Sequence, residues 1–165
     1  MAAMPTSGTA VVSTPADEQI LITREFDAPR ELVFRAYTEP ELVSRWWPGR
    51  RGEMKVCEID LRPGGRWRYA MLAEGGFDVA FHGEYREVVP GERVVFTEIF
   101  ELPDGTFSEA TTNTATFVEA EGRTTLRLLT ETSSREVRDM ILQSGMEGGV
   151  QEGLDILEEL AIGLR

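Results

Sequence analysis

Glu98 is the residue of this sequence best suited to acid–base chemistry inside a fold. In the alternating stretch 93–102 it shares one strand face with Val94 and Phe96, and we expect that face to point inward. A carboxyl group among apolar side chains has a raised pKa unless it is paired, and it could then act as a general acid or base or anchor a ligand. The competing hypothesis, which we favour, places Glu98 near the rim, paired with an arginine.

His82 and Cys57 are the single histidine and the single cysteine of the chain. Glu84 follows His82 at strand spacing, and a histidine beside a carboxylate can carry protons near neutral pH. If Phe81 points inward, however, His82 points to solvent, so we expect no catalytic role for it. Cys57 has no partner for an internal disulfide and is expected to be a small buried side chain.

Motifs for nucleotide and metal cofactors are missing from the sequence. It contains no phosphate loop, dinucleotide fingerprint or nucleophile elbow, and one histidine with one cysteine leaves few soft metal ligands. We therefore expect no cofactor and no metal. An enzyme built on this chain would have to work by positioning and acid–base chemistry in a mostly apolar cavity.

Two tryptophans and a proline, at Trp46, Trp47 and Pro48, form an apolar group where a surface connection is expected. The chain returns beside them through an Arg-Pro-Gly-Gly-Arg-Trp turn that ends at Trp67. Large rings beside a Pro/Gly turn are costly to leave in water, which predicts that they line the mouth of a pocket. The alternative is a hydrophobic plug on the core.

Alternation and turn residues predict the elements that position these side chains. Residues 19–26 have the pattern of a strand, and two short helices should follow, over 29–37 and from a capping box of Thr38 and Glu41. Gly and Pro turns then divide an antiparallel meander into six strands: 54–61, 65–73, 77–89, 93–102, 110–119 and 124–131. Two further inward series are expected, Trp67, Tyr69 and Met71 in one strand and Phe81, Gly83 and Tyr85 in the next.

The C-terminal segment is predicted to be the apolar element around which this sheet curls. Ser133 and Glu136 form a capping box, and no proline follows, so we expect one long helix to the end of the chain. Gly145, Gly149 and Gly153 recur beside its apolar stripe. Each glycine costs about 1 kcal/mol relative to alanine. Close packing against another backbone, which we favour, or an open space beside the helix would explain them.

Composition restricts the partners and the domain plan. Asp and Glu number 29 against 17 Lys and Arg, and the formal net charge of -12 repels phosphate backbones and anionic lipids. We expect neither nucleic-acid binding nor membrane insertion. Residues 1–18 lack the features of a secretory signal and are predicted to be a disordered tail, which leaves 19–165 as a single domain. The missing signal favours the cytoplasm.

Four segments resemble the SRPBCC superfamily, and within it the bacterial homologues of the activator of the ninety-kilodalton heat-shock ATPase: FDAPRELVFRAYTEPELVSRWWPG, VCEIDLRPGGRWRYAM, HGEYREVVPGERVVFT and MEGGVQEGLDILEEL. The resemblance covers about residues 19–160. It implies an α+β helix-grip (START-like, birch-pollen-allergen-like) fold, in which a curved seven-strand antiparallel sheet and a long C-terminal helix enclose an apolar cavity. Val150 stands where tryptophan is common among these relatives, which implies a shallower cavity wall here.

The superfamily includes lipid carriers, hormone receptors and cyclases, so the resemblance leaves several functions open. We expect a noncatalytic protein that binds a small lipophilic molecule between helix and sheet. Nine residues are expected to line the cavity: Trp46, Trp47, Trp67, Tyr69, Phe81, Phe96, Glu98, Met146 and Val150. One alternative is a cyclase or dehydratase that uses Glu98, Tyr69 or His82. The others are a chaperone-associated interaction module and a homodimer.

Overall fold

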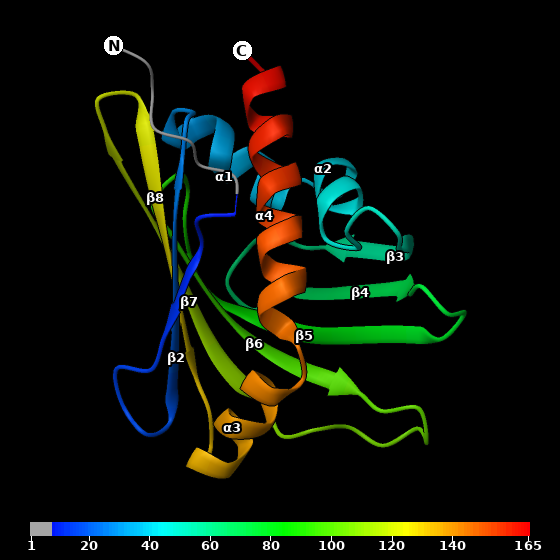
Figure 1. Ribbon diagram of the computed structural model, residues 1–165. Helices are drawn as coiled ribbons and strands as arrows, with labels where there is room; N and C mark the ends of the chain where they lie inside the picture. The colour runs from blue at the N-terminus through cyan, green and yellow to red at the C-terminus, as the bar shows by residue number, and fades with distance from the viewer. Residues whose placement is uncertain (1–7) are drawn as a thin grey trace.

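A single antiparallel sheet of eight strands curves around the C-terminal helix in the computed structural model, which describes residues 8–165 (Figure 1). The order across the sheet is β1-β2-β8-β7-β6-β5-β4-β3. The elements run along the chain as β1 (Val11–Ser13), β2 (Gln19–Phe26), α1 (Arg30–Thr38), α2 (Pro40–Trp46), β3 (Glu53–Ile59), β4 (Arg66–Leu72), β5 (Asp78–Val89), β6 (Arg93–Glu101), β7 (Thr111–Ala120), β8 (Arg123–Glu131), α3 (Arg135–Gln143) and α4 (Met146–Gly163). The predicted α+β helix-grip fold is confirmed.

The seven predicted strands all form, with bounds within two residues of the expected ones. The eighth strand, β1, lies inside the segment that we expected to be disordered. It pairs antiparallel with β2, where Val11 stands opposite Thr23, and Ala10 beside it is 6% exposed. The prediction of a disordered tail is therefore wrong for β1, because the open edge of β2 supplies backbone hydrogen-bond partners. Residues 1–7 lie outside the described part of the chain.

The two short helices after β2 are confirmed, but the capping box predicted for the second helix is wrong. Thr38 closes α1 instead, and its Oγ1 donates to the Phe34 carbonyl oxygen at 2.7 Å. Glu39 is the N-cap of α2, and Pro40 occupies the first turn. Proline suits that position because its missing N–H has no helical partner and its φ is already helical.

The single long C-terminal helix that we predicted is divided into α3 and α4. The break falls at Gly145, whose φ of 83° is left-handed, a conformation that glycine adopts without steric cost. Ser134 rather than Ser133 caps α3, since its side chain accepts a hydrogen bond from the Val137 N–H at 3.1 Å. In the described residues, no helix combines the length and the apolar character needed to span a membrane.

The C-terminal half of α4 fills the core. Leu154, Leu157 and Ala161 are all at most 5% exposed and pack with α1, α2 and the inner face of the sheet. Toward its N-terminus the inner face of α4 becomes less covered, since Met146 and Val150 are only half-buried. Packing is therefore dense at one end of the helix and more open at the other.

Candidate functional site

Aromatic rings from neighbouring strands meet on the inner face of the sheet. The ring centroid of Trp67 in β4 lies 4.7 Å from that of Tyr69 and 5.8 Å from that of Phe96 in β6. Tyr85 of β5 lies 6.4 Å from Phe96. Such edge and tilted contacts stabilise rings beyond the area that they bury. The predicted inward series are confirmed here, since Trp67 and Tyr85 are 4% and 5% exposed.

Gly83 makes room for Trp67, with which it pairs across β4 and β5. The Trp67 indole Nε1 donates to the Thr97 carbonyl oxygen at 3.1 Å. A Cβ atom on Gly83 would lie 1.8 Å from that oxygen and 2.7 Å from the indole nitrogen, far inside van der Waals contact. Trp67 can therefore occupy this position only because residue 83 is glycine. The Trp67 ring lies in the core with little accessible surface.

Trp46 and Trp47 have different surroundings although they are adjacent in sequence. Trp46 stacks on Tyr37 at 5.8 Å, and its Nε1 donates to the Ala36 carbonyl oxygen at 2.8 Å. Its own carbonyl oxygen would lie 3.3 Å from a Cβ atom on Gly153. Trp46 therefore joins α1, α2 and α4 as a plug of the core, while Trp47 turns to the aromatic rings of the sheet.

Trp47 lies between those rings and a cleft. Its ring centroid is 5.3 Å from that of Tyr69 and 5.8 Å from that of Phe81. Trp47 also lines a cleft of about 570 Å3 between α4, the loop after α2 and the end of β4. The lining residues are Trp47, Pro48, Gly49, Arg50, Arg51, Gly52, Met71, Glu74, Gly149 and Glu152.

The three glycines of the C-terminal segment have three different surroundings. Gly145 supplies the left-handed break, and Gly153 meets Trp46 closely. Gly149 lines the cleft and has nothing within 4 Å of the position of a Cβ atom. The close packing that we favoured for all three therefore holds only for Gly153, because α4 approaches α2 there and diverges from it toward its N-terminus.

Glu98 lies on the same inward face of β6 as Phe96. It pairs with Thr111 across β6 and β7, and both Thr111 and the next inward residue, Asn113, are at most 7% exposed. Burial raises the pKa of Glu98 to about 7. The arginine partner that we favoured is wrong for residues 8–165, where no arginine bonds this carboxylate, because Arg68 and Arg93 pair with Glu101 and Glu87 instead.

The Glu98 carboxylate also borders accessible space. Within the described chain, every fully buried side-chain nitrogen or oxygen has a hydrogen-bond partner. The Glu98 side chain is half-buried, and none of its contacts is a side-chain hydrogen bond to a described residue. Its oxygens therefore keep some surface that water can reach, in an interior that otherwise raises the pKa by desolvation.

Polar side chains of β7 and β8 continue the inner face beyond Glu98. Asn113 Nδ2 donates to Thr111 Oγ1 at 3.1 Å, and Thr130 Oγ1 donates to Asn113 Oδ1 at 2.6 Å. The amide of Asn113 is thus satisfied by its neighbours, as a buried polar group must be. Thr111, Asn113 and Thr130 thus make the inner face polar where β7 and β8 form it.

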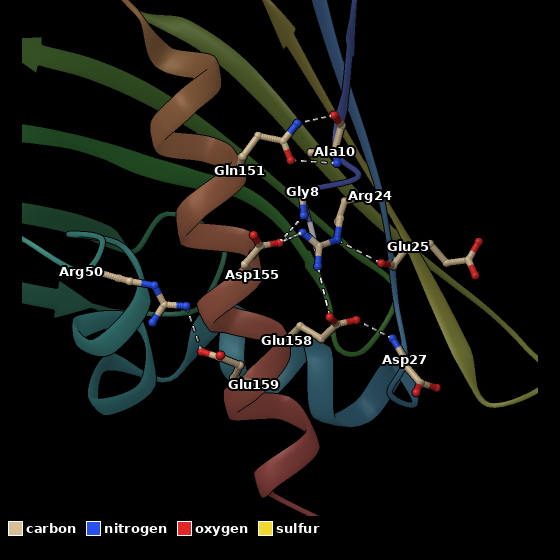
Figure 2. Close-up of polar contacts among 10 residues, drawn as sticks. All are labelled: Gly8, Ala10, Arg24, Glu25, Asp27, Arg50, Gln151, Asp155, Glu158 and Glu159. Carbon is tan, nitrogen blue, oxygen red and sulfur yellow. Dashed lines mark hydrogen bonds and ion pairs between the residues drawn. The ribbon is translucent and has the colours of Figure 1, made fainter. Parts of the chain in front are cut away.

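Arg24 ties the sheet to α4 through a buried ion-pair cluster that our sequence reasoning missed (Figure 2). Its Nη1 donates to Asp155 Oδ1 at 2.5 Å and its Nη2 to Glu158 Oε1 at 3.2 Å, and no part of its side chain is exposed. Glu158 Oε2 also accepts from the Asp27 N–H at 2.8 Å. The sequence did indicate that Arg24 is buried, because it lies on the same strand face as Ile20 and Ile22.

Comparisons with known proteins agree with this architecture. A family model described as "Activator of Hsp90 ATPase homolog 1-like protein" matches residues 27–161. The chain belongs to this family. No curated protein shows a significant match. The family and the fold indicate a ligand-binding or interaction module.

Solved structures of bacterial proteins are similar to this family member over almost their whole length. A Mycobacterium smegmatis protein is 26% identical, with 92% of this chain and 96% of that chain covered and a TM-score of 0.83. A Chromobacterium violaceum protein is 30% identical, with 88% and 98% covered and a TM-score of 0.76. A Nitrosomonas europaea protein at 24% identity, with 89% and 96% covered and a TM-score of 0.77, shares the fold.

His82 lies on the opposite face of β5 from the aromatic interior of this Activator of Hsp90 ATPase-like domain. Its Nδ1 is 3.0 Å from Glu101 Oε2, so Glu101 rather than Glu84 is its carboxylate neighbour. Arg68 donates two hydrogen bonds of 2.9 Å to Glu101 and, together with His82, holds the pKa of that carboxyl below its usual value. His82 thus belongs to an outer ion-pair cluster, away from Glu98.

The other titratable groups of the interior are protonated near neutral pH. Burial raises the pKa of Tyr69, Tyr37 and Tyr85. Burial also raises the pKa of the half-buried Cys57 thiol, which argues against a thiolate nucleophile. Across residues 8–165, no group of three or more His, Cys, Asp and Glu side chains is arranged to hold a metal ion.

Proposed function

We propose that this protein binds a small lipophilic molecule between the inner face of the sheet and the N-terminal half of α4. The observation that carries the proposal is the incomplete burial of Tyr69, Phe81 and Phe96, which retain accessible surface although they face inward. In a close-packed core such rings would be covered by neighbouring side chains. Met146 and Val150 face the same region from α4 and are also half-buried.

The cleft beside Trp47 is the proposed entrance. Gly149 projects no side chain into it, and Trp47 separates it from Tyr69 and Phe81 by a single ring. Its charged residues pair with one another, since Arg51 Nη1 lies 3.2 Å from Glu74 Oε2 and the Arg50 N–H bonds Glu152. An apolar molecule would pass these ion pairs at the rim and displace the ring of Trp47.

Burial of apolar area would supply the affinity. At about 25 cal/mol per Å2, a ligand that buries a few hundred Å2 gains several kcal/mol before the cost of association. That gain corresponds to binding of the order of micromolar. A mostly apolar site with a few polar groups is the usual design for such ligands.

A titration with pyrene, an uncharged apolar fluorophore, tests the proposal. Its emission should shift to the pattern of an apolar environment and saturate at one equivalent. The variant Val150→Trp should abolish the shift, because the larger side chain fills the space below α4. Ile162→Trp is the matched control, since Ile162 is a β-branched residue of the same helix that is 42% exposed. Equal binding by both variants, or no saturable binding by the wild type, would refute the proposal.

Glu98 favours one second candidate, an acid–base enzyme that catalyses cyclisation or loss of water in the same interior. A carboxyl group with a pKa of about 7 is suited to both the acid and the base role near neutral pH. For such an enzyme, Glu98→Gln would abolish turnover of a bound substrate while pyrene binding persists. Loss of both together would assign Glu98 to structure instead.

A further inference from the structure

We propose that the natural ligand is a lipophilic molecule with a protonated amine, and that the Glu98 carboxylate holds its ammonium group among aromatic rings. This inference rests on the proposed function and names the chemical class of the ligand. Glu98 faces the interior without a bonded side-chain partner among the described residues, the buried arginines pair elsewhere, and aromatic rings lie on the same inner face.

Glu98 faces the interior with a carboxylate that no described side chain bonds. Its strand neighbour Phe96 and its cross-strand neighbour Thr111 both face the interior. The Asn113 amide, one pair further along, is already satisfied by Thr111 and Thr130. The carboxylate therefore retains acceptor capacity toward the accessible space, and that capacity suits a donor on the ligand.

The buried cations of the described chain are engaged elsewhere. Arg24 donates to Asp155 and Glu158 of α4, and Arg138 donates to Asp139 and to the Ala16 carbonyl oxygen. Neither guanidinium bonds Glu98. A desolvated carboxylate is stabilised in its charged form by a neighbouring cation or by hydrogen-bond donors. Because the protein supplies none within residues 8–165, a cationic group on the ligand is the complementary partner.

Aromatic rings provide the second half of an ammonium site. Phe96 precedes Glu98 by two residues on the same face, and its ring contacts Trp67 and Tyr85. The Tyr37 ring of α1 is close enough for the Glu98 charge to raise its pKa further. The faces of such rings attract a cation, and the attraction grows when water is excluded. A carboxylate among rings thus discriminates an amine from an alcohol of equal size.

The formal charge of -12 requires a control for nonspecific attraction of cations. Glu84 serves for this, because it is an acid of β5 whose side chain is 40% exposed and only loosely paired with Arg86 at 3.6 Å. Glu84→Gln and Glu98→Gln remove the same charge from the same sheet. Only the second change removes a carboxylate that borders the interior.

Calorimetric titration of the intact protein with decylamine and with decanol at about pH 8 tests the inference, since the carboxylate and the amine are then both charged. We expect decylamine to bind about tenfold or more tightly than decanol. Glu98→Gln should remove this preference and leave decanol binding unchanged, whereas Glu84→Gln should preserve it.

The outcomes separate this inference from the proposed function. Equal binding of decylamine and decanol by the wild type would overturn the amine assignment and leave lipophilic binding intact. Absence of binding by both molecules would overturn the two proposals together. If Glu98→Gln fails to fold, equal binding of the two molecules by the wild type still overturns the inference. A preference that survives Glu98→Gln and is lost in Glu84→Gln would assign it to the surface charge and overturn the inference.

Discussion

Arg24 and Asp155 join β2 to α4 through a hydrogen bond of 2.5 Å between Nη1 and Oδ1, with the Arg24 side chain wholly buried. Glu158, one turn further along α4, shares the same guanidinium (Figure 2). The guanidinium also lies over the ring of Phe26, 5.0 Å from its centroid. This cluster links the C-terminal helix to the sheet.

Replacement of the guanidinium should destabilise the fold strongly. Arg24→Met leaves two acidic side chains of α4 without the cation that they share, and a broken buried ion pair of this kind costs about 3–5 kcal/mol. Urea unfolding should show this loss. Arg30→Met is the control, because the Arg30 and Glu92 side chains are exposed and 3.9 Å apart, and it should cost less than about 1 kcal/mol. Similar losses in both variants would contradict the structural role of the cluster.

The Gln151 side chain of α4 makes two hydrogen bonds to the backbone beside β1. The Ala10 N–H donates to Gln151 Oε1 at 3.0 Å, and Gln151 Nε2 donates back to the Ala10 carbonyl oxygen at 2.6 Å (Figure 2). Gln151→Ala should lower the free energy of unfolding by about 1–3 kcal/mol. Hydrogen exchange should accelerate in β1 while that of the paired strands β7 and β8 is unchanged. Unaltered protection of β1 would show that the Gln151 side chain does not hold it.

Alanine substitutions should distinguish the glycines of α4. Gly148→Ala and Gly149→Ala should each stabilise the protein by about 0.5–1 kcal/mol, because alanine is the better helix former and both sites are open. Gly153→Ala should be destabilising, since its Cβ atom would lie 3.3 Å from the carbonyl oxygen of Trp46, whose indole is fixed by a hydrogen bond. Thermal unfolding of the three variants measures the differences. A stabilised Gly153→Ala variant would mean that α2 moves easily.

Glu98 should make stability depend on pH. Its folded-state pKa of about 7 exceeds the ordinary value of 4.5, so the folded state binds more protons between these values. Stability should therefore fall as the pH rises from about 4.5 to about 7, by up to about 3 kcal/mol, and then level off. The stabilising effect of Glu98→Gln should accordingly be larger at about pH 8 than at about pH 5. If Glu84→Gln changed stability by the same amount between these two pH values, the net charge of the protein, and not Glu98, would explain the pH dependence.

Alternation and turn residues were sufficient to predict most of the sheet. The strands between Gln19 and Glu131 formed where Gly and Pro turns divided alternating stretches, and the inward positions of Trp67 and Tyr85 followed from the two-residue period. These are local properties, because a residue's side of its own strand depends only on its immediate neighbours. The resemblance carried by the Trp-Trp-Pro and Arg-Pro-Gly-Gly segments supplied the family and the arrangement of the helix.

Tertiary structure alone decided what those inward residues meet. Adjacent tryptophans took different roles because α4 approaches Trp46 at Gly153 and diverges beside Trp47. Glu98 remained without an arginine because Arg68 of β4 and Arg93 of β6 pair with Glu101 and Glu87 instead. Periodicity assigns a side chain to a face of its own element. Which residue of another element it contacts depends on the tilt and the distance between the two elements. Contacts between residues far apart in the sequence determine both.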